Sequence, residues 1–172
     1  MIGKAWLWIG ALVVAAVGVV AFVSVGRSPS GTPAQQLAAW ASSTKLGQDV
    51  GTLEGDGASM RRALSTHASM TTLHTVCAAM ANDAQTFNDE LPSPDGALTQ
   101  LLARGYSLEY DAAESCYRAP SASSPLLARA ATDRARAAHL FGLALRRVRL
   151  LTGRSVPTTT TTVPDLTGTS LF

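Results

Sequence analysis

Two cysteines carry the clearest chemistry in this chain. Cys77 and Cys116 are its only thiols, and each falls on the apolar seam of a segment with helical periodicity. In an oxidising compartment, an even pair of cysteines in a small domain is typical of a disulfide. The closed loop of about 40 residues would stabilise the fold by roughly 3–4 kcal/mol. Two unpaired core cysteines are the alternative.

A metal site is the second chemistry that these residue types could support. His74 stands three residues before Cys77, so the two side chains share one helix face. Together with Cys116 and either His67 or His139 they could surround a zinc ion. No second paired ligand motif accompanies them, and disulfide formation would consume both thiols. We therefore expect neither a metal nor a cofactor.

Catalytic motifs are missing from the sequence. It contains no nucleophile elbow, no phosphate-binding loop and no H-E-x-x-H motif. Glu109, Asp111 and Glu114 lie within two helical turns, where a solvated acidic face explains them better than a general acid–base pair. We expect that the chain is not an enzyme.

Arg146, Arg147 and Arg149 gather near the end of the last predicted helix. Such a cluster either contacts anionic lipid headgroups or complements the helix dipole and pairs with acidic side chains. The second interpretation is favoured. The expected acidic partners are Asp89, Glu90 and Asp95. Nucleic acid is not an expected partner, because no aromatic residues are interleaved with these arginines.

An uncharged apolar run from Ala5 to Val25 precedes all of these residues. As a helix it would cover roughly the 30 Å hydrocarbon core of a bilayer. A cleaved signal peptide is the alternative, although its apolar core is usually only about 7–15 residues long. The greater length of this run and the lack of alanines in its nearest cleavage-like triplet, Ser24-Val25-Gly26, predict an uncleaved signal anchor. The N-terminal amine and Lys4 outweigh Arg27, which predicts that its N-terminus lies in the cytoplasm. The rest of the chain would then lie outside the cytoplasm, in the cell envelope.

Helical signals follow the apolar run in four segments. Thr32-Pro33-Ala34-Gln35 forms a capping box that opens a helix expected to reach about Leu64. Either this helix kinks or breaks at Gly55-Asp56-Gly57, or Gly47, Gly51 and Gly57 permit another helix to approach closely. The second helix, about 68–90, has the most regular seam of apolar residues. The third spans about 94–118 with Ser93 as its expected cap, and the fourth begins at Pro125 and ends at Gly153.

These segments predict an all-α protein: an N-terminal single transmembrane helix followed by an up-down antiparallel four-helix bundle. The Thr- and Pro-rich tail has too few apolar residues to form a core, which predicts disorder and suggests O-glycosylation. The expected parts are a short cytoplasmic N-terminus at 1–4, a transmembrane signal anchor at 5–26, a linker at 27–32, the extracytoplasmic bundle at 33–153 and the tail at 154–172.

The order of several short motifs carries a resemblance. Trp40 precedes a long helix, Cys77 and Asp83 follow, then Leu91-Pro-Ser-Pro-Asp95 and a closing Cys116. Over about residues 38–118 the chain resembles a loose group of uncharacterised membrane-anchored or secreted helical proteins of high-GC actinobacteria. The resemblance implies a helical bundle, a disulfide and a cell-envelope setting, but no activity.

The leading hypothesis is a non-enzymatic, membrane-anchored cell-envelope protein that acts as a protein-interaction or accessory module. A bundle that binds or senses a small molecule is the alternative. Its cavity would be opened by small residues on the helix seams and lined by larger apolar ones, namely Gly47, Gly51, Gly105, Met60, Met70, Met80 and Phe87. A prophage-encoded membrane protein is also compatible with the sequence.

Overall fold

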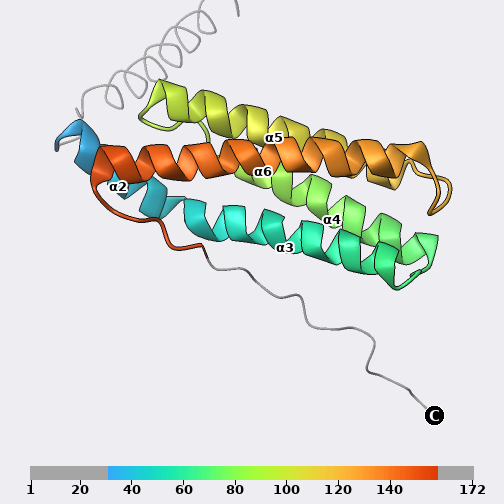
Figure 1. Cartoon of the computed structure of the whole chain (residues 1–172). Helices are drawn as coiled ribbons and strands as arrows, with labels where there is room; N and C mark the ends of the chain where they lie inside the picture. Colours follow the sequence, from blue (N-terminus) through green and yellow to red (C-terminus); the bar gives the residue numbers. More distant parts are fainter. Residues whose placement is uncertain (1–30, 159–172) are drawn as a thin grey trace, which may run out of the picture. The chain divides into compact units, whose positions relative to one another are not determined.

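A computed structural model describes residues 31–158, and within them all regular structure is helical. The expectations for the N-terminus, the signal anchor and most of the linker and tail lie outside these residues. Within 31–158 no helix is both long and apolar enough to cross a membrane. The helices are α2 (Pro33–Ser43), α3 (Leu46–Ser65), α4 (Met70–Asn88), α5 (Gly96–Tyr117) and α6 (Pro125–Thr152) (Figure 1).

The first expected helix is divided into α2 and α3. The division falls at Lys45, whose backbone is left-handed with φ of 53°. The hydroxyls of Ser43 and Thr44 both donate to the carbonyl of Trp40, at 2.9 and 3.0 Å, and compete there with regular helix hydrogen bonds. Of the two alternatives for the glycines of α3, a break at Gly55–Gly57 is wrong, because α3 runs through it without interruption.

Local caps set the other helix boundaries. The Ser69 side chain accepts from the amide of Thr72 at the start of α4, and Ser124 accepts from Leu126 at the start of α6. Asp95, rather than the expected Ser93, caps α5 by accepting from the amide of Leu98 at 2.7 Å. Consequently α5 begins at Gly96 rather than at Pro94. At the other end of α6, Gly153 has a φ of 66°, as a C-terminal glycine was expected to have.

The helices form an antiparallel bundle in which chain direction alternates from α3 to α6 (Figure 1). In this bundle α5 packs against both α4 and α6, α3 packs against α4, and the short α2 packs against α6. The chain after α6 returns over the α2–α3 junction. There Val156 and Pro157 lie so close to Gly47 that a β-carbon on this glycine would overlap them.

Two apolar clusters make up the core. The first includes Leu53, Leu102 and Phe141, and lies at the end of the bundle that holds α2. The second surrounds Met80 and Cys116 at the other end. Every helix from α3 to α6 contributes to both clusters, and between its two contributions each helix carries a charged residue. The fold therefore sets a layer of charge between the two halves of the core.

Candidate functional site

The charged layer is formed by one residue from each of four helices: Asp56 of α3, Asp83 of α4, Glu109 of α5 and Arg134 of α6. Three of them are largely removed from solvent, with exposed fractions of 8% for Asp56, 1% for Glu109 and 9% for Arg134. Ionised groups are rarely buried this deeply unless they are paired. The layer is therefore the first place to look for chemistry inside the bundle.

Arg134 is the cation of this layer. Its Nε donates to Oε1 of Glu109 at 2.6 Å, and its Nη2 donates to the backbone carbonyl of Leu53 at 2.8 Å. The guanidinium occupies the space that a side chain at position 57 would need, so Gly57 is what lets it approach α3. This contact joins α6 to both α5 and α3.

Asp56 and Asp83 form a carboxyl–carboxyl pair beside this cation. Burial raises the pKa of Asp56 to about 7, and the charge of Asp83 and a hydrogen bond to it act in the same direction. Glu109 raises the pKa of Asp56 further, while Arg134 opposes the shift. Burial also raises the pKa of Glu109 itself, against the lowering effect of Arg134. Asp56 therefore keeps its proton to a much higher pH than an ordinary aspartate does.

A second carboxyl pair joins Asp49 of α3 to Glu90, just beyond α4. Burial raises the pKa of Asp49 to about 7, with the charge of Glu90 and a hydrogen bond to it adding to the effect and Lys45 opposing it. Burial raises the pKa of Glu90 as well. Tyr106 lies close enough that both carboxylates add to the burial that raises its pKa. The α3–α4 side of the bundle thus holds two places that retain a proton.

The acidic face expected at Glu109, Asp111 and Glu114 is only partly present. Asp111 is exposed, and Glu114 forms an ion pair with Arg118 at 3.0 Å. The expectation is wrong for Glu109, which points into the core toward Arg134. The sequence signal that could have found it is the spacing of three to four residues that places Glu109 in line with Gly105, Ala112 and Cys116.

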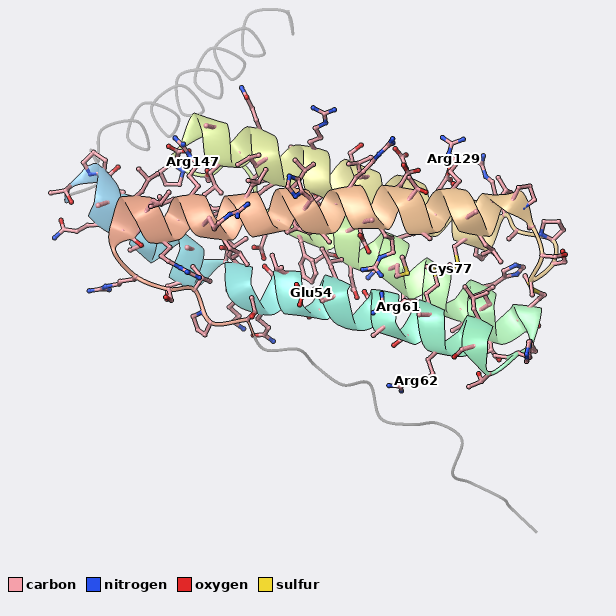
Figure 2. The ribbon with its side chains drawn as sticks, in the orientation of Figure 1. Glu54, Arg61, Arg62, Cys77, Arg129 and Arg147 are labelled. Carbon is pink, nitrogen blue, oxygen red and sulfur yellow. A yellow bond between two sulfur atoms is a disulfide. The ribbon has the colours of Figure 1, made fainter. Side chains whose placement is uncertain are left out.

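Cys77 of α4 and Cys116 of α5 lie together in the second apolar cluster. Their α-carbons are 5.8 Å apart and their sulfur atoms are joined as a disulfide (Figure 2). Both residues have an exposed fraction of 0%. The loop 89–95 carries the chain past the end of α4 before α5 begins, which brings the two positions level with each other.

The histidine expected beside these cysteines is engaged elsewhere. Nε2 of His74 lies 3.1 Å from the carbonyl oxygen of Ala119, and its ring lies 5.2 Å from that of Tyr117. Among residues 31–158 no group of three or more His, Cys, Asp or Glu side chains is arranged to hold a metal ion. His74 therefore secures the end of α5.

The three predicted arginines have different surroundings. Arg147 makes a two-pronged ion pair with Asp95, from Nε to Oδ1 at 2.6 Å and from Nη2 to Oδ2 at 2.8 Å. This pair lowers the pKa of Asp95. Arg146 and Arg149 are exposed, and neither has an acidic partner within the described part of the chain. The expected pairing with acidic side chains therefore accounts for Arg147 alone.

Glycines on the helix seams are used for packing. Phe141 fills the space above Gly105, as Arg134 does above Gly57. The residues expected to line an internal cavity are divided between the two clusters: Met60 and Met80 belong to the second, Met70 packs against it, and Phe87 packs against the first. They do not face one shared space, and the hypothesis of a ligand inside the bundle stays a prediction.

A groove lies on the surface between α5 and α6. Its volume is about 1020 Å³, and its apolar lining includes Leu108, Ala135 and Leu140. The basic residues that line it are Arg104, Arg136 and His139. Arg136 also contacts Asp133 at 3.4 Å, whereas Arg104 has no acidic partner among residues 31–158. The groove therefore combines an apolar lining with positive charge.

No family model, curated protein or solved structure matches this chain.

Proposed function

We propose that this chain is a non-enzymatic, membrane-anchored cell-envelope protein whose helical bundle binds a protein partner. The apolar run from Ala5 to Val25 supports the anchor. The closeness of Cys77 and Cys116 supports an oxidising compartment. Under this proposal the anchor holds the bundle at the outer face of the membrane, where it serves as an interaction or accessory module.

The groove between α5 and α6 is the observation that carries the choice of partner. Arg104 and Arg136 supply positive charge, and Arg104 has no acidic partner in the described part of the chain. The small side chains of Ala131 and Ala135 leave room for a helix to approach α6 closely. Charge complementarity then favours an acidic, amphipathic helical segment of another protein.

Site-specific photo-crosslinking of the full chain in its native cells tests this function. A photoreactive residue replaces Ala135 in the groove, and the matched control replaces Ala78, an exposed alanine on α4. We expect one crosslinked protein from position 135 and none from position 78. Arg104→Glu should weaken this crosslink, while Arg104→Lys should preserve it because the charge is kept.

Two outcomes would contradict the proposal. Crosslinking at position 135 that does not exceed that at position 78 would mean that the groove binds no protein partner. A crosslink that is equally strong in Arg104→Glu and in the unmodified chain would mean that positive charge does not select the partner.

A further inference from the structure

The last two turns of α6 expose an unusual combination of side chains. Leu150 has an exposed fraction of 83% and Leu151 one of 43%, although most large apolar side chains of the described residues are buried. Arg146 and Leu150 are four residues apart, so they share one face of the helix, and Arg149 lies beside them. This part of α6 thus presents apolar groups surrounded by basic ones.

Acidic side chains do not neutralise this surface. Of the three arginines, Arg147 alone forms an ion pair, with Asp95. Glu90 lies close to Asp49 and Lys45, because both of them affect its pKa. Asp89 is then the other acidic residue at this end of the bundle. Arg146 and Arg149 stay without an acidic partner among residues 31–158. Exposed leucines next to unpaired arginines are typical of a helix that lies at a lipid surface.

The position of this surface in the chain also favours contact with a lipid bilayer. Ala34 and Ala38, in the first turns of α2, line one hollow together with Thr152 and Arg154. The end of α6 is therefore beside the point where the chain enters the bundle. Residues 26–32 connect that point to the apolar run, and extended chain covers at most about 3.5 Å per residue, or about 25 Å in all.

We propose that the last two turns of α6 dock on the surface of an anionic lipid bilayer. Leu150 and Leu151 enter the headgroup zone, and Arg146 and Arg149 bind lipid phosphates. This inference rests on the proposed function, because it requires the anchor formed by the apolar run. It adds a second, electrostatic contact that fixes how the bundle stands on the membrane and which face stays open to a partner.

Depth-dependent fluorescence quenching tests the proposal. The full chain carries an environment-sensitive dye at Leu150→Cys or, as the matched control at the other end of the bundle, at Ala122→Cys, an exposed position in the loop before α6. It is reconstituted in phosphatidylcholine vesicles with or without a one-quarter share of phosphatidylglycerol, and a nitroxide-labelled lipid serves as quencher. We expect strong quenching at position 150 only, and only with the anionic lipid.

The arginines are tested by Arg146→Gln with Arg149→Gln. At about fivefold per arginine, this double variant should lower the ratio of docked to free bundle by roughly 25-fold, because each arginine contributes its own attraction to the anionic surface. Arg62→Gln, an exposed substitution near the end of α3, should leave the ratio unchanged.

Flotation of the same vesicles separates this proposal from the proposed anchor. If the chain fails to float with neutral vesicles, the proposed membrane anchor is wrong, and the proposed docking of α6, which requires the anchor, is wrong as well. If the chain floats but dyes at positions 150 and 122 are quenched equally, the anchor stands and docking is wrong. Strong quenching at position 150 in neutral vesicles, unchanged by the two arginine substitutions, would also overturn the electrostatic contact.

Discussion

The guanidinium of Arg134 shows how single residues govern this fold. It contacts the carboxylate of Glu109 on α5 and the carbonyl of Leu53 on α3, and it lies against Gly57. Each contact depends on the others: a larger residue at position 57 would displace the guanidinium, and a displaced guanidinium would leave Glu109 buried without a partner. The helical cost of a glycine, about 1 kcal/mol, is offset by this arrangement.

Removing one member of this ion pair should be costly. We expect Arg134→Met to lower the free energy of unfolding by about 3–5 kcal/mol, because it leaves Glu109 buried and unpaired. Arg134→Met combined with Glu109→Leu should recover most of the loss. Urea denaturation of the full chain in detergent, followed by circular dichroism, measures both. The control Arg62→Met should change stability by less than about 0.5 kcal/mol, and equal losses in the single and double variants would argue against the ion pair.

The two carboxyl pairs predict a dependence of stability on pH. Asp49 and Asp56 each have a pKa raised to about 7, so the folded chain binds more protons than the unfolded chain between about pH 4 and pH 7. Their contribution to stability is fully present below about pH 4 and is lost as the pH rises through 7. For Asp56 alone we expect a change of up to about 4 kcal/mol.

Asp56→Asn isolates this effect, because the amide cannot ionise. The difference in unfolding free energy between the unmodified chain and this variant should shift in favour of the variant as the pH is raised from about 5 to about 8. Asp111→Asn, at an exposed position, should show no such shift. If the difference for Asp56→Asn stays constant over this range, the raised pKa of Asp56 is wrong.

At the level of helices, most helix ends could be predicted from the sequence, whereas the junction between α2 and α3 could not. The caps at Ser124 and Gly153 rest on local chemistry and were predictable. Lys45 gives no local sign of a left-handed backbone, and hydroxyls such as that of Thr44 are common inside helices. The glycines near position 56 can be read as helix breakers, yet they stay helical, and the side chain of Arg134 from a distant segment fills the space that Gly57 leaves.

The site follows the same division. The cysteine pair was predictable because both residues lie on apolar seams, and the partner of Arg147 because Asp95 lies at the same end of the bundle. The burial of Glu109 could not be predicted, because a glutamate close in sequence to two other acids has the pattern of a surface residue. Its burial depends on a cation that is 25 residues away in sequence.

Relieving the left-handed backbone at position 45 should stabilise the junction. We expect Lys45→Gly to raise the free energy of unfolding by about 1 kcal/mol, since glycine adopts this backbone without a steric cost. Gln48→Gly, at an exposed helical position three residues on, should lower it by about 1 kcal/mol. Thermal unfolding measured by circular dichroism compares the two. Effects of the same sign would contradict the left-handed assignment.

For the whole molecule, the division of the core into two clusters is the main organising feature. The first cluster ties α2 to the bundle and lies at the end where we propose membrane contact, whereas the second surrounds Cys77 and Cys116. The charged layer lies between them. Changes of pH therefore act on the middle of the bundle through Asp56 and on the first cluster through Asp49, whereas changes of redox state act on the second cluster.

Loss of the cysteine pair should weaken that end. The pair encloses a separation of 39 residues, so replacing both cysteines by alanine should lower the free energy of unfolding by roughly 3–4 kcal/mol. Hydrogen exchange should increase most in the amides near Met80 and Ala113, in the second cluster. Intact mass measured without reductant should lie two hydrogen atoms below that of the reduced chain. Two free thiols in protein isolated from its native compartment would contradict the pairing.

The bond between Cys77 and Cys116 also sets a mechanical limit. When the molecule is stretched between its ends, tension passes through the two sulfur atoms, and the chain between them carries none. Full extension of the oxidised molecule is therefore shorter than that of the reduced one by the 39-residue separation, or roughly 130 Å at about 3.4 Å per residue. Under tension, the segments of α4 and α5 would therefore stay attached to each other even after every helix had unwound.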